Sequence, residues 1–242
     1  MKKLLKSAAI IAFSIVAQAQ TKSPKLENSL LWEVSGNGLS KPSYLYGTVH
    51  MICASDYFLS EKAKKAFDSA NKLVLEINLS DPKETADMQQ MAMGKQPLSK
   101  ILAPQNLLKL NSILQKSGMT LQQVDNFSLF GVMSLISMKT FGCADLKFYE
   151  MNFIETAKQR NLSIQGLETA KNQLEALENA YTATELIAML EESSKEETAK
   201  LVSKYKEENI LALHEITTDK RFMSEKTRKS ILDNRNKNWL KI

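Results

Sequence analysis

Apolar and polar positions alternate over short runs near the start of the chain and then follow helical spacing. Residues 30–35 and 43–50 carry aromatic and β-branched side chains and flank a Gly-Asn-Gly turn at 36–38, which predicts a hairpin of two strands. Because successive side chains of a strand point to opposite faces, His50 shares one face with Thr48. We therefore expect His50 at the carboxyl end of a strand, where α/β sheets usually bind ligands.

The next segment predicts a crossover unit. Apolar residues recur at helical spacing after Ser60, and the near-continuous apolar run 72–78 predicts a strand covered on both faces. A strand, a helix and a strand over this length predict a right-handed crossover. Glu76 lies inside the apolar run, where a carboxylate is costly to bury unless it is paired or bound to a metal.

The rest of the chain is predominantly helical, with one further short strand at 162–167 that ends at Glu168. We predict an α+β fold with a small central mixed sheet, an N-terminal hairpin and a crossover helix, covered by many helices. The predicted helices after the crossover are 83–96, 104–118, 128–141, 149–160, 171–180, 183–205, 207–216 and 224–240.

The first residues have the pattern of a signal peptide. Three lysines precede an apolar run that is too short to span a bilayer comfortably, and Ala17-Gln18-Ala19 offers a small-x-small cleavage site. We expect 1–19 to be removed and 20–242 to form a single exported domain, periplasmic or secreted. The alternative is an uncleaved membrane anchor. After cleavage we expect no membrane span, because no second long apolar run follows.

Charge gives no reason to expect nucleic-acid binding. The formal net charge is +5, and loss of three lysines with the signal peptide leaves about +2 (5 − 3). We find no basic cluster interleaved with aromatic residues, so nucleic acid is not an expected partner.

The two cysteines, Cys53 and Cys143, allow two interpretations. An exported location permits a disulfide, and a bridge closing a loop of about ninety residues would stabilise the fold by roughly 4 kcal/mol on the chain-entropy model. The alternative is a catalytic thiol at Cys53, with His50 three residues away as its base.

Few residues are candidates for chemistry. The nucleophile elbow, the P-loop, the dinucleotide-binding glycine pattern and the His-Glu-x-x-His helix do not occur, and His50 and His214 are the two histidines. We assign no role to His214. A lone His50 could be structural, but Glu76 beside it would make half of a typical hydrolytic metal site.

Glu168 and Arg235 complete the candidate set. Glu168 follows a strand end, although a carboxylate there could equally begin a helix. Arg235 shares a helical stripe with Ile231 and Trp239 and could hold an anionic group, pair with a glutamate or form a surface salt bridge.

Five motifs in order resemble the TraB/GumN family, which is related to the Tiki proteases, over nearly all of the predicted mature chain. They are Leu31-Trp32-Glu33-Val34-Ser35-Gly36, Ser43-Tyr44-Leu45-Tyr46-Gly47-Thr48-Val49-His50, Leu73-Val74-Leu75-Glu76-Ile77-Asn78, Gly166-Leu167-Glu168-Thr169 and Arg235-Asn236-Lys237-Asn238-Trp239.

The resemblance implies a compact α+β domain with a metal-dependent hydrolase site built from two Gly-x-x-His motifs and a strand glutamate. Residues 47–50 match the first motif, Glu76 matches the glutamate, and Glu168 and Arg235 match further polar positions. Tiki proteins are membrane-associated metalloproteases supported by manganese or cobalt. Some relatives carry a cysteine pair at the positions of Cys53 and Cys143, which supports the disulfide.

The chain departs from the family pattern at its end. The second Gly-x-x-His of the family lies on a strand after the Arg-Asn helix, and this chain stops at Ile242. We therefore expect an incomplete domain that holds Mn, Co or Zn weakly and has impaired activity. Two hypotheses follow: a metal-dependent hydrolase, peptidase-like, acting on a peptide or small molecule, or a non-catalytic exported protein that binds such a ligand.

Overall fold

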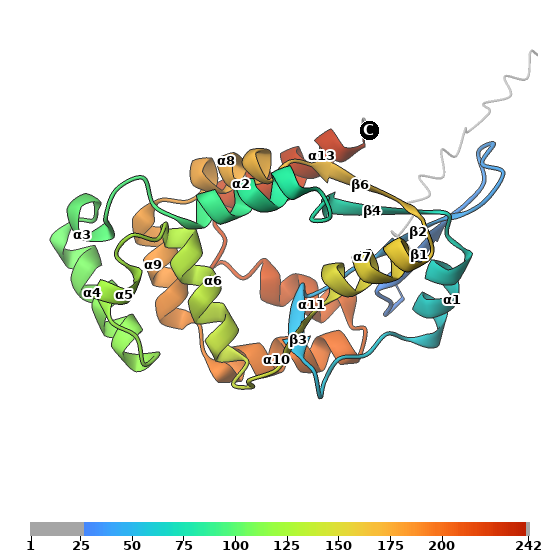
Figure 1. Ribbon diagram of the computed structural model, residues 1–242. Helices are drawn as coiled ribbons and strands as arrows, with labels where there is room; N and C mark the ends of the chain where they lie inside the picture. Colours follow the sequence, from blue (N-terminus) through green and yellow to red (C-terminus); the bar gives the residue numbers. More distant parts are fainter. Residues whose placement is uncertain (1–26, 241–242) are drawn as a thin grey trace, which may run out of the picture.

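A computed structural model describes residues 27–240, so the predicted signal peptide at 1–19 lies outside the described residues. Within the described residues, six strands and a larger number of helices confirm the predicted α+β class (Figure 1). The strands are β1 (Leu31–Val34), β2 (Ser43–Tyr46), β3 (Met51–Cys53), β4 (Lys72–Ile77), β5 (Leu146–Phe148) and β6 (Ser163–Glu168).

The helices occupy most of the chain between and after the strands. They are α1 (Glu61–Ser69), α2 (Pro82–Ala92), α3 (Leu98–Ile101), α4 (Pro104–Lys116), α5 (Leu121–Val124), α6 (Leu129–Thr140), α7 (Tyr149–Gln159), α8 (Ala170–Ala180), α9 (Ala183–Glu192), α10 (Lys195–Lys206), α11 (Ile210–Thr217), α12 (Glu225–Arg228), the π-helix η1 (Lys229–Asn234) and α13 (Arg235–Trp239).

The described strands form three separate two-stranded ladders rather than one central sheet. The hairpin β1–β2 is antiparallel as predicted, β3 pairs with β5 in antiparallel fashion, and β4 pairs with β6 in parallel. The crossover predicted from 43–50 to 72–78 is therefore wrong. The parallel partner of β4 comes from much later in the chain, a pairing that local apolar patterns cannot reveal.

The predicted second strand is also wrong at its end. β2 stops at Tyr46, and a new strand begins at Met51, so His50 precedes β3 instead of closing β2. His50 adopts a left-handed backbone conformation, with φ at +59°. This conformation breaks strand geometry, which explains why one predicted strand becomes two.

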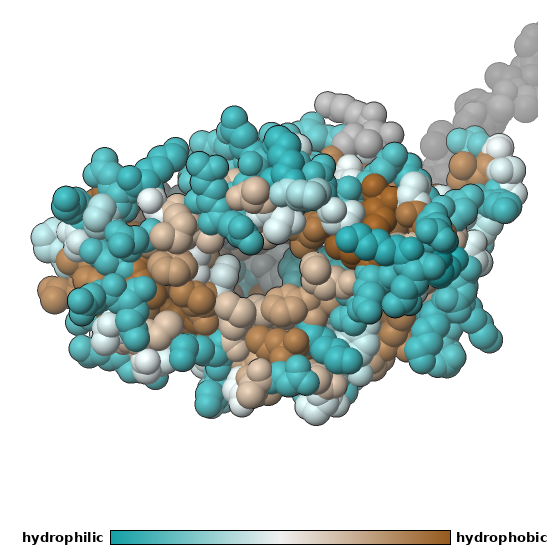
Figure 2. All heavy atoms as spheres, viewed as in Figure 1, coloured by the Kyte–Doolittle hydropathy of each residue, from teal (hydrophilic) through white to brown (hydrophobic). Residues whose placement is uncertain are grey.

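A helical lobe, defined here as α3, α4, α5, α6 and α9, forms one end of the molecule (Figure 1). Its interior is an apolar cluster that includes the fully buried Leu110 and Leu114. Figure 2 shows hydrophobic side chains gathered over this lobe and a hollow in the same face between α6 and α7. Ser194 caps α10 and thereby divides the predicted helix 183–205 into α9 and α10.

The β4–β6 ladder is covered on one face by α7. Leu73 and Leu75 point to that face and pack against Ile154 and Ala157. The opposite face carries the exposed Val74, so the prediction of a strand covered on both faces is wrong. The alternation along β4 places Glu76 on the open face, which removes much of the cost of burying its carboxylate.

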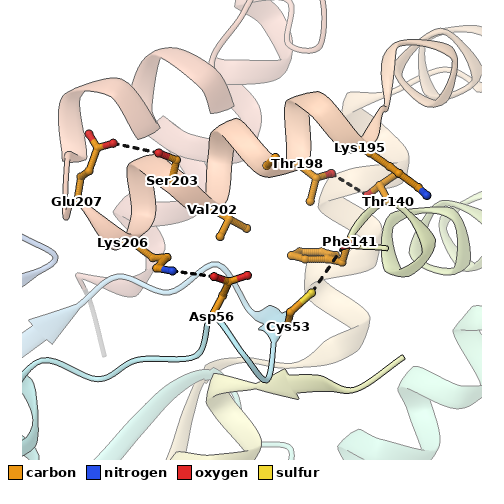
Figure 3. A pocket seen from close by; sticks show the side chains of 11 residues that line it. Cys53, Asp56, Thr140, Phe141, Lys195, Thr198, Val202, Ser203, Lys206 and Glu207 are labelled. Atoms are coloured by element: carbon orange, nitrogen blue, oxygen red, sulfur yellow. Dashed lines mark hydrogen bonds and ion pairs between the residues drawn. The ribbon is translucent and has the colours of Figure 1, made fainter. Parts of the chain in front are cut away.

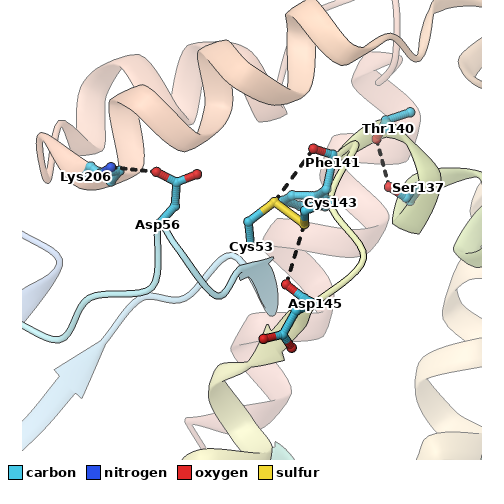
Figure 4. The surroundings of a disulfide bond; sticks show 8 residues. All are labelled: Cys53, Asp56, Ser137, Thr140, Phe141, Cys143, Asp145 and Lys206. Atoms are coloured by element: carbon cyan, nitrogen blue, oxygen red, sulfur yellow. Dashed lines mark hydrogen bonds and ion pairs between the residues drawn. A yellow bond between two sulfur atoms is a disulfide. The ribbon is translucent and has the colours of Figure 1, made fainter.

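The predicted disulfide is present. Cys53 and Cys143 are joined, with their Cα atoms 6.0 Å apart, so the alternative of a free catalytic thiol is wrong (Figure 4). The bridge links β3 to the loop that leads into β5. It therefore reinforces the ladder that carries His50 at its other end.

Candidate functional site

A strand-end cluster, defined here as Glu76, Glu168, Gln173 and Arg235, gathers three of the predicted site residues. The Nη2 atom of Arg235 lies 2.5 Å from Oε2 of Glu76 and 2.6 Å from Oε1 of Glu168. The Nε atom of Arg235 also donates to Oε1 of Glu168 at 2.8 Å. The guanidinium thus binds both carboxylates at once, a geometry that its planar array of donors permits.

Parallel pairing explains how the two carboxylates meet. The register sets Ile77 opposite Glu168, so Glu76 and Glu168 lie at the same end of the ladder. Gly166 allows the strands to approach there, because a Cβ atom on it would lie 2.9 Å from the backbone nitrogen of Asn78. Gly47 has no such constraint, because a Cβ atom on it would lie 3.9 Å from the Leu30 side chain, an ordinary van der Waals distance.

Arg235 reaches the cluster from the C-terminal helices. It begins α13, directly after the π-helix η1. Short π-helical turns inside helices are frequent at functional sites. The guanidinium also lies over the ring of Trp239, 4.4 Å from its centroid, so the predicted stripe of these two residues is confirmed. The alternative of a surface salt bridge is wrong, because the Arg235 side chain is 14 % exposed.

Two residues that sequence patterns missed support the cluster. The Nε2 atom of Gln173 donates to Oε2 of Glu76 at 3.0 Å and to Oε1 of Glu168 at 3.1 Å. The buried carboxylate of Glu84 accepts a hydrogen bond from the backbone nitrogen of Ala170 at 2.7 Å, where α8 begins. Gln173 lies five residues after Glu168, near the start of α8, and the sequence pattern singled out neither Gln173 nor Glu84.

Exposure differs within the cluster. The Glu168 side chain is 9 % exposed and the Glu76 side chain is 42 % exposed. Two carboxylates and one guanidinium carry a formal charge of −1 in total. The side chain that presents this charge to solvent is Glu76, so Glu76 is the member best placed to meet a cation or a substrate.

His50 lies in a second polar group formed with Thr48 and Glu150. Its Nδ1 atom is 2.9 Å from Oε1 of Glu150, and the Thr48 hydroxyl donates to the same oxygen at 2.7 Å. The imidazole is 68 % exposed. Glu150 is 100 residues from His50 in the chain, so no local pattern pointed to it.

The electrostatics of His50 connect the two groups. The hydrogen bond to Glu150 raises the pKa of His50 above its usual 6.5, and burial works against it. Glu76 adds to the increase through its charge, and Arg235 opposes it. His50 and the strand-end cluster therefore lie within electrostatic range, although His50 and Glu76 belong to different ladders.

The donor set for a metal is small. Among residues 27–240, no group of three or more His, Cys, Asp or Glu side chains is arranged to hold an ion. His50 and Glu76 offer one imidazole nitrogen and one carboxylate, both of which suit Zn, Mn or Co. The hydrogen bonds described for Glu76 use Oε2 and not Oε1.

A pocket of about 610 Å³ lies elsewhere, beside the disulfide and against α10 (Figure 3). Its described lining includes Cys53 and the ion pair between Lys206 and Asp56, whose Nζ and Oδ1 atoms are 2.7 Å apart. His50 and Arg235 are not part of that lining. The candidate chemistry and this pocket are therefore separate features of the molecule.

Comparisons with known proteins give one matching family profile and distant relatives. The sequence profile of the TraB/PrgY/gumN family matches residues 30–242. Metalloprotease TIKI1 of Danio rerio is 30% identical over 100 residues, which is 40% of this chain and 20% of that protein. Metalloprotease TIKI2 of Danio rerio is 38% identical over 61 residues, which is 25% of this chain and 12% of that protein. The matched part of this chain thus spans a fifth or less of each relative, and no solved structure matches.

Within residues 27–240, no helix has both the length and the apolar character needed to cross a membrane.

Proposed function

Because the chain belongs to the TraB/PrgY/gumN family, we propose that it is an exported, metal-dependent hydrolase that acts on peptide-like substrates. The single observation that carries the proposal is the convergence of Glu76, Glu168 and Arg235 at one end of the β4–β6 ladder, within electrostatic range of His50. Functional residues of α/β proteins commonly collect at the carboxyl ends of parallel strands. The printed names of the two Danio rerio relatives add support for metalloprotease chemistry.

His50 and Glu76 are the residues that we assign to the ion. An imidazole nitrogen and a carboxylate oxygen are typical ligands of hydrolytic metals, and both side chains are accessible to solvent. A divalent ion held there would polarise a carbonyl and lower the pKa of a bound water. Two protein ligands are fewer than the three usual at catalytic zinc, so we expect weak affinity.

The remaining members of the strand-end cluster hold Glu76 in place. Arg235 binds Oε2 of Glu76 and thereby restricts the orientation of the carboxylate. Glu168 fixes the other side of the guanidinium and, at 9 % exposure, does not reach substrate itself. In this proposal Glu76 also accepts the proton that the attacking water loses, as general bases of hydrolases do. Arg235 and Glu168 are therefore positioning residues rather than substrate ligands.

The disulfide between Cys53 and Cys143 supports export. Disulfides persist in oxidising compartments and are rare in the reducing cytosol. The proposed removal of residues 1–19 is tested by sequencing the N-terminus of the protein recovered from the periplasm or the medium. A mature N-terminus near Gln20 is expected, whereas an intact Met1 would contradict cleavage.

The proposal is tested by titrating the metal-free chain with Mn²⁺, Co²⁺ and Zn²⁺ and by assaying hydrolysis of a mixed peptide pool by mass spectrometry. We expect weak binding that His50→Ala and Glu76→Gln each abolish. His214→Ala and Glu175→Gln are the matched controls, because both replace the same residue types at exposed helical positions and Glu175 pairs with Lys171 rather than with the cluster.

Each outcome has a clear meaning. Absence of metal binding by the wild-type chain, or binding that survives His50→Ala, would contradict the metal site. Metal-dependent binding of peptides without their hydrolysis would instead favour the non-catalytic binding protein.

A further inference from the structure

Glu150 makes two contacts through one oxygen, and both go to the segment that carries His50. Its Oε1 atom accepts from the Thr48 hydroxyl at 2.7 Å and lies 2.9 Å from Nδ1 of His50. The Glu150 side chain is 19 % exposed, whereas the imidazole is 68 % exposed. The Glu150 carboxylate is thus largely buried, and the His50 ring is the member of the pair that is exposed to solvent.

The fold fixes this contact through the backbone. The β3–β5 ladder sets Met51 opposite Phe148, which places His50 and Tyr149 next to that pair in the chain. The backbone nitrogen of Tyr149 donates to the His50 carbonyl at 2.9 Å. The disulfide near the other end of this ladder further restrains the two strands.

Two further features restrict His50 and Glu150 themselves. His50 is held at φ +59°, a left-handed conformation that non-glycine residues adopt rarely and often at functional sites. Glu150 stands in the first turn of α7, where the helix dipole favours a negative charge. The buried Tyr149 side chain donates to the Phe58 carbonyl and anchors the start of that helix.

The Oε1 atom of Glu150 faces Nδ1 of His50 and already accepts a hydrogen bond from the Thr48 hydroxyl. A carboxylate oxygen in this arrangement acts as an acceptor towards Nδ1 as well. The proton of a neutral His50 therefore resides on Nδ1, where it completes the contact, and Nε2 carries a free lone pair.

We propose that Glu150 is the positioning residue of His50, which it holds in the Nδ1-protonated tautomer with Nε2 turned outward as the ligand of the metal. The inference rests on the proposed function and deepens it. Carboxylates bound to the second nitrogen of a metal-ligating histidine fix its ring orientation and raise its basicity. Thr48 has a supporting role, because its hydroxyl holds the shared oxygen in place.

The competing interpretation is that Glu150 only stabilises the start of α7. NMR of the imidazole nitrogens separates the two, because the tautomer of His50 depends on its partner and not on helix stability. The chain contains two histidines, so His214 is an internal control in the same spectrum. Glu155→Ala, an exposed acidic residue on the same helix, is the matched control variant.

We expect the wild-type chain to show His50 protonated on Nδ1. Glu150→Ala should release the ring to a mixture of tautomers, and Glu150→Gln should largely restore the wild-type spectrum, because the amide oxygen still accepts from Nδ1. An Nδ1 proton that persists in Glu150→Ala, or a mixture in the wild-type chain, would overturn the proposal.

The second arm measures affinity for Mn²⁺ by titration. Loss of such a partner usually weakens metal binding about tenfold to a hundredfold, so Glu150→Ala should raise the Kd by that factor and Glu155→Ala should leave it unchanged. Equal affinity of Glu150→Ala and the wild-type chain would overturn the metal role. A wild-type chain that binds no metal would contradict the proposed function, while the NMR arm would still decide whether Glu150 positions His50.

Discussion

The helical lobe and the strand-end cluster are built on opposite principles. The lobe buries apolar side chains such as Leu110 and Leu114 completely. The cluster gathers two carboxylates, a guanidinium and an amide, and leaves Glu76 partly exposed. The lobe therefore contributes hydrophobic stability, and the cluster holds charged groups in a fixed arrangement at some cost in free energy.

The difference separates residues that keep the chain folded from residues that perform its chemistry. Substitutions in the lobe should lower the free energy of unfolding and leave metal binding unchanged. Substitutions in the cluster should change metal binding more than stability. The disulfide lies in a third region, the β3–β5 ladder. It stabilises the fold and also restrains the ladder that positions His50.

The largest expected effect is loss of the disulfide. Replacing both Cys53 and Cys143 by Ser should lower the free energy of unfolding by about 4 kcal/mol, because the unfolded chain regains the freedom of a long loop. Urea unfolding of the oxidised wild-type chain and the double variant measures this difference. An unchanged midpoint of unfolding would show that the disulfide adds no stability. The β3–β5 ladder would then not link stability to the position of His50.

A smaller loss is expected in the core of the helical lobe. Leu114→Ala should cost about 3 kcal/mol through lost burial and the cavity that remains. Leu108→Ala on the same helix is the control, because Leu108 is exposed and its removal should cost no more than about 0.5 kcal/mol. Thermal unfolding compares the two variants. If Leu114→Ala also abolished metal binding, the role of the helical lobe in stability could not be separated from the role of the strand-end cluster in metal binding.

Arg235→Gln should cost about 2 kcal/mol, because charge-assisted hydrogen bonds to Glu76 and Glu168 are lost. The cost should shrink by about 1 kcal/mol when Glu168→Gln is already present, because the two residues interact directly. A double-mutant cycle in urea measures the interaction. Strict additivity would contradict the ion pair as described.

The smallest expected effect is the pH dependence of stability that comes from two tyrosine hydroxyls, those of Tyr46 in β2 and Tyr205 in α10. Burial raises the pKa of Tyr46 to about 12, and burial also raises the pKa of Tyr205, which lies 3.4 Å away between hydroxyl oxygens. The neutral form is favoured in the folded state, so this contribution to stability is complete below pH 10 and is lost as the pH rises towards 12. Ultraviolet titration of wild type and Tyr46→Phe measures it, and a Tyr46 that ionises like free tyrosine would contradict the burial.

Sequence patterns predicted most elements but not how the strands pair. Local periodicity located α4 and α7 to within two residues and the hairpin β1–β2. The pairing of β4 with β6 and of β3 with β5 joins segments about ninety residues apart, and short apolar runs carry no record of their partner. The single sheet and the crossover were therefore wrong although the α+β class was right.

The candidate site was predicted in its charged members and missed in its supporting ones. Glu76 stood out because a carboxylate inside an apolar strand needs a partner, Glu168 because it follows a strand end, and Arg235 because it shares a helical stripe with Trp239. Glu150 and Gln173 are ordinary polar residues on amphipathic helices, so their sequence context gave no reason to select them. Three-dimensional contacts were needed to connect Glu150 to His50.

The most direct test of the central claim is the rate of metal-dependent peptide hydrolysis by the wild-type chain and by Glu76→Gln, with Glu175→Gln as the control. The account predicts measurable hydrolysis that requires added Mn²⁺, a loss of that activity in Glu76→Gln, and an unchanged rate in Glu175→Gln. Equal rates in the wild-type chain and Glu76→Gln would contradict a hydrolytic site at the strand-end cluster.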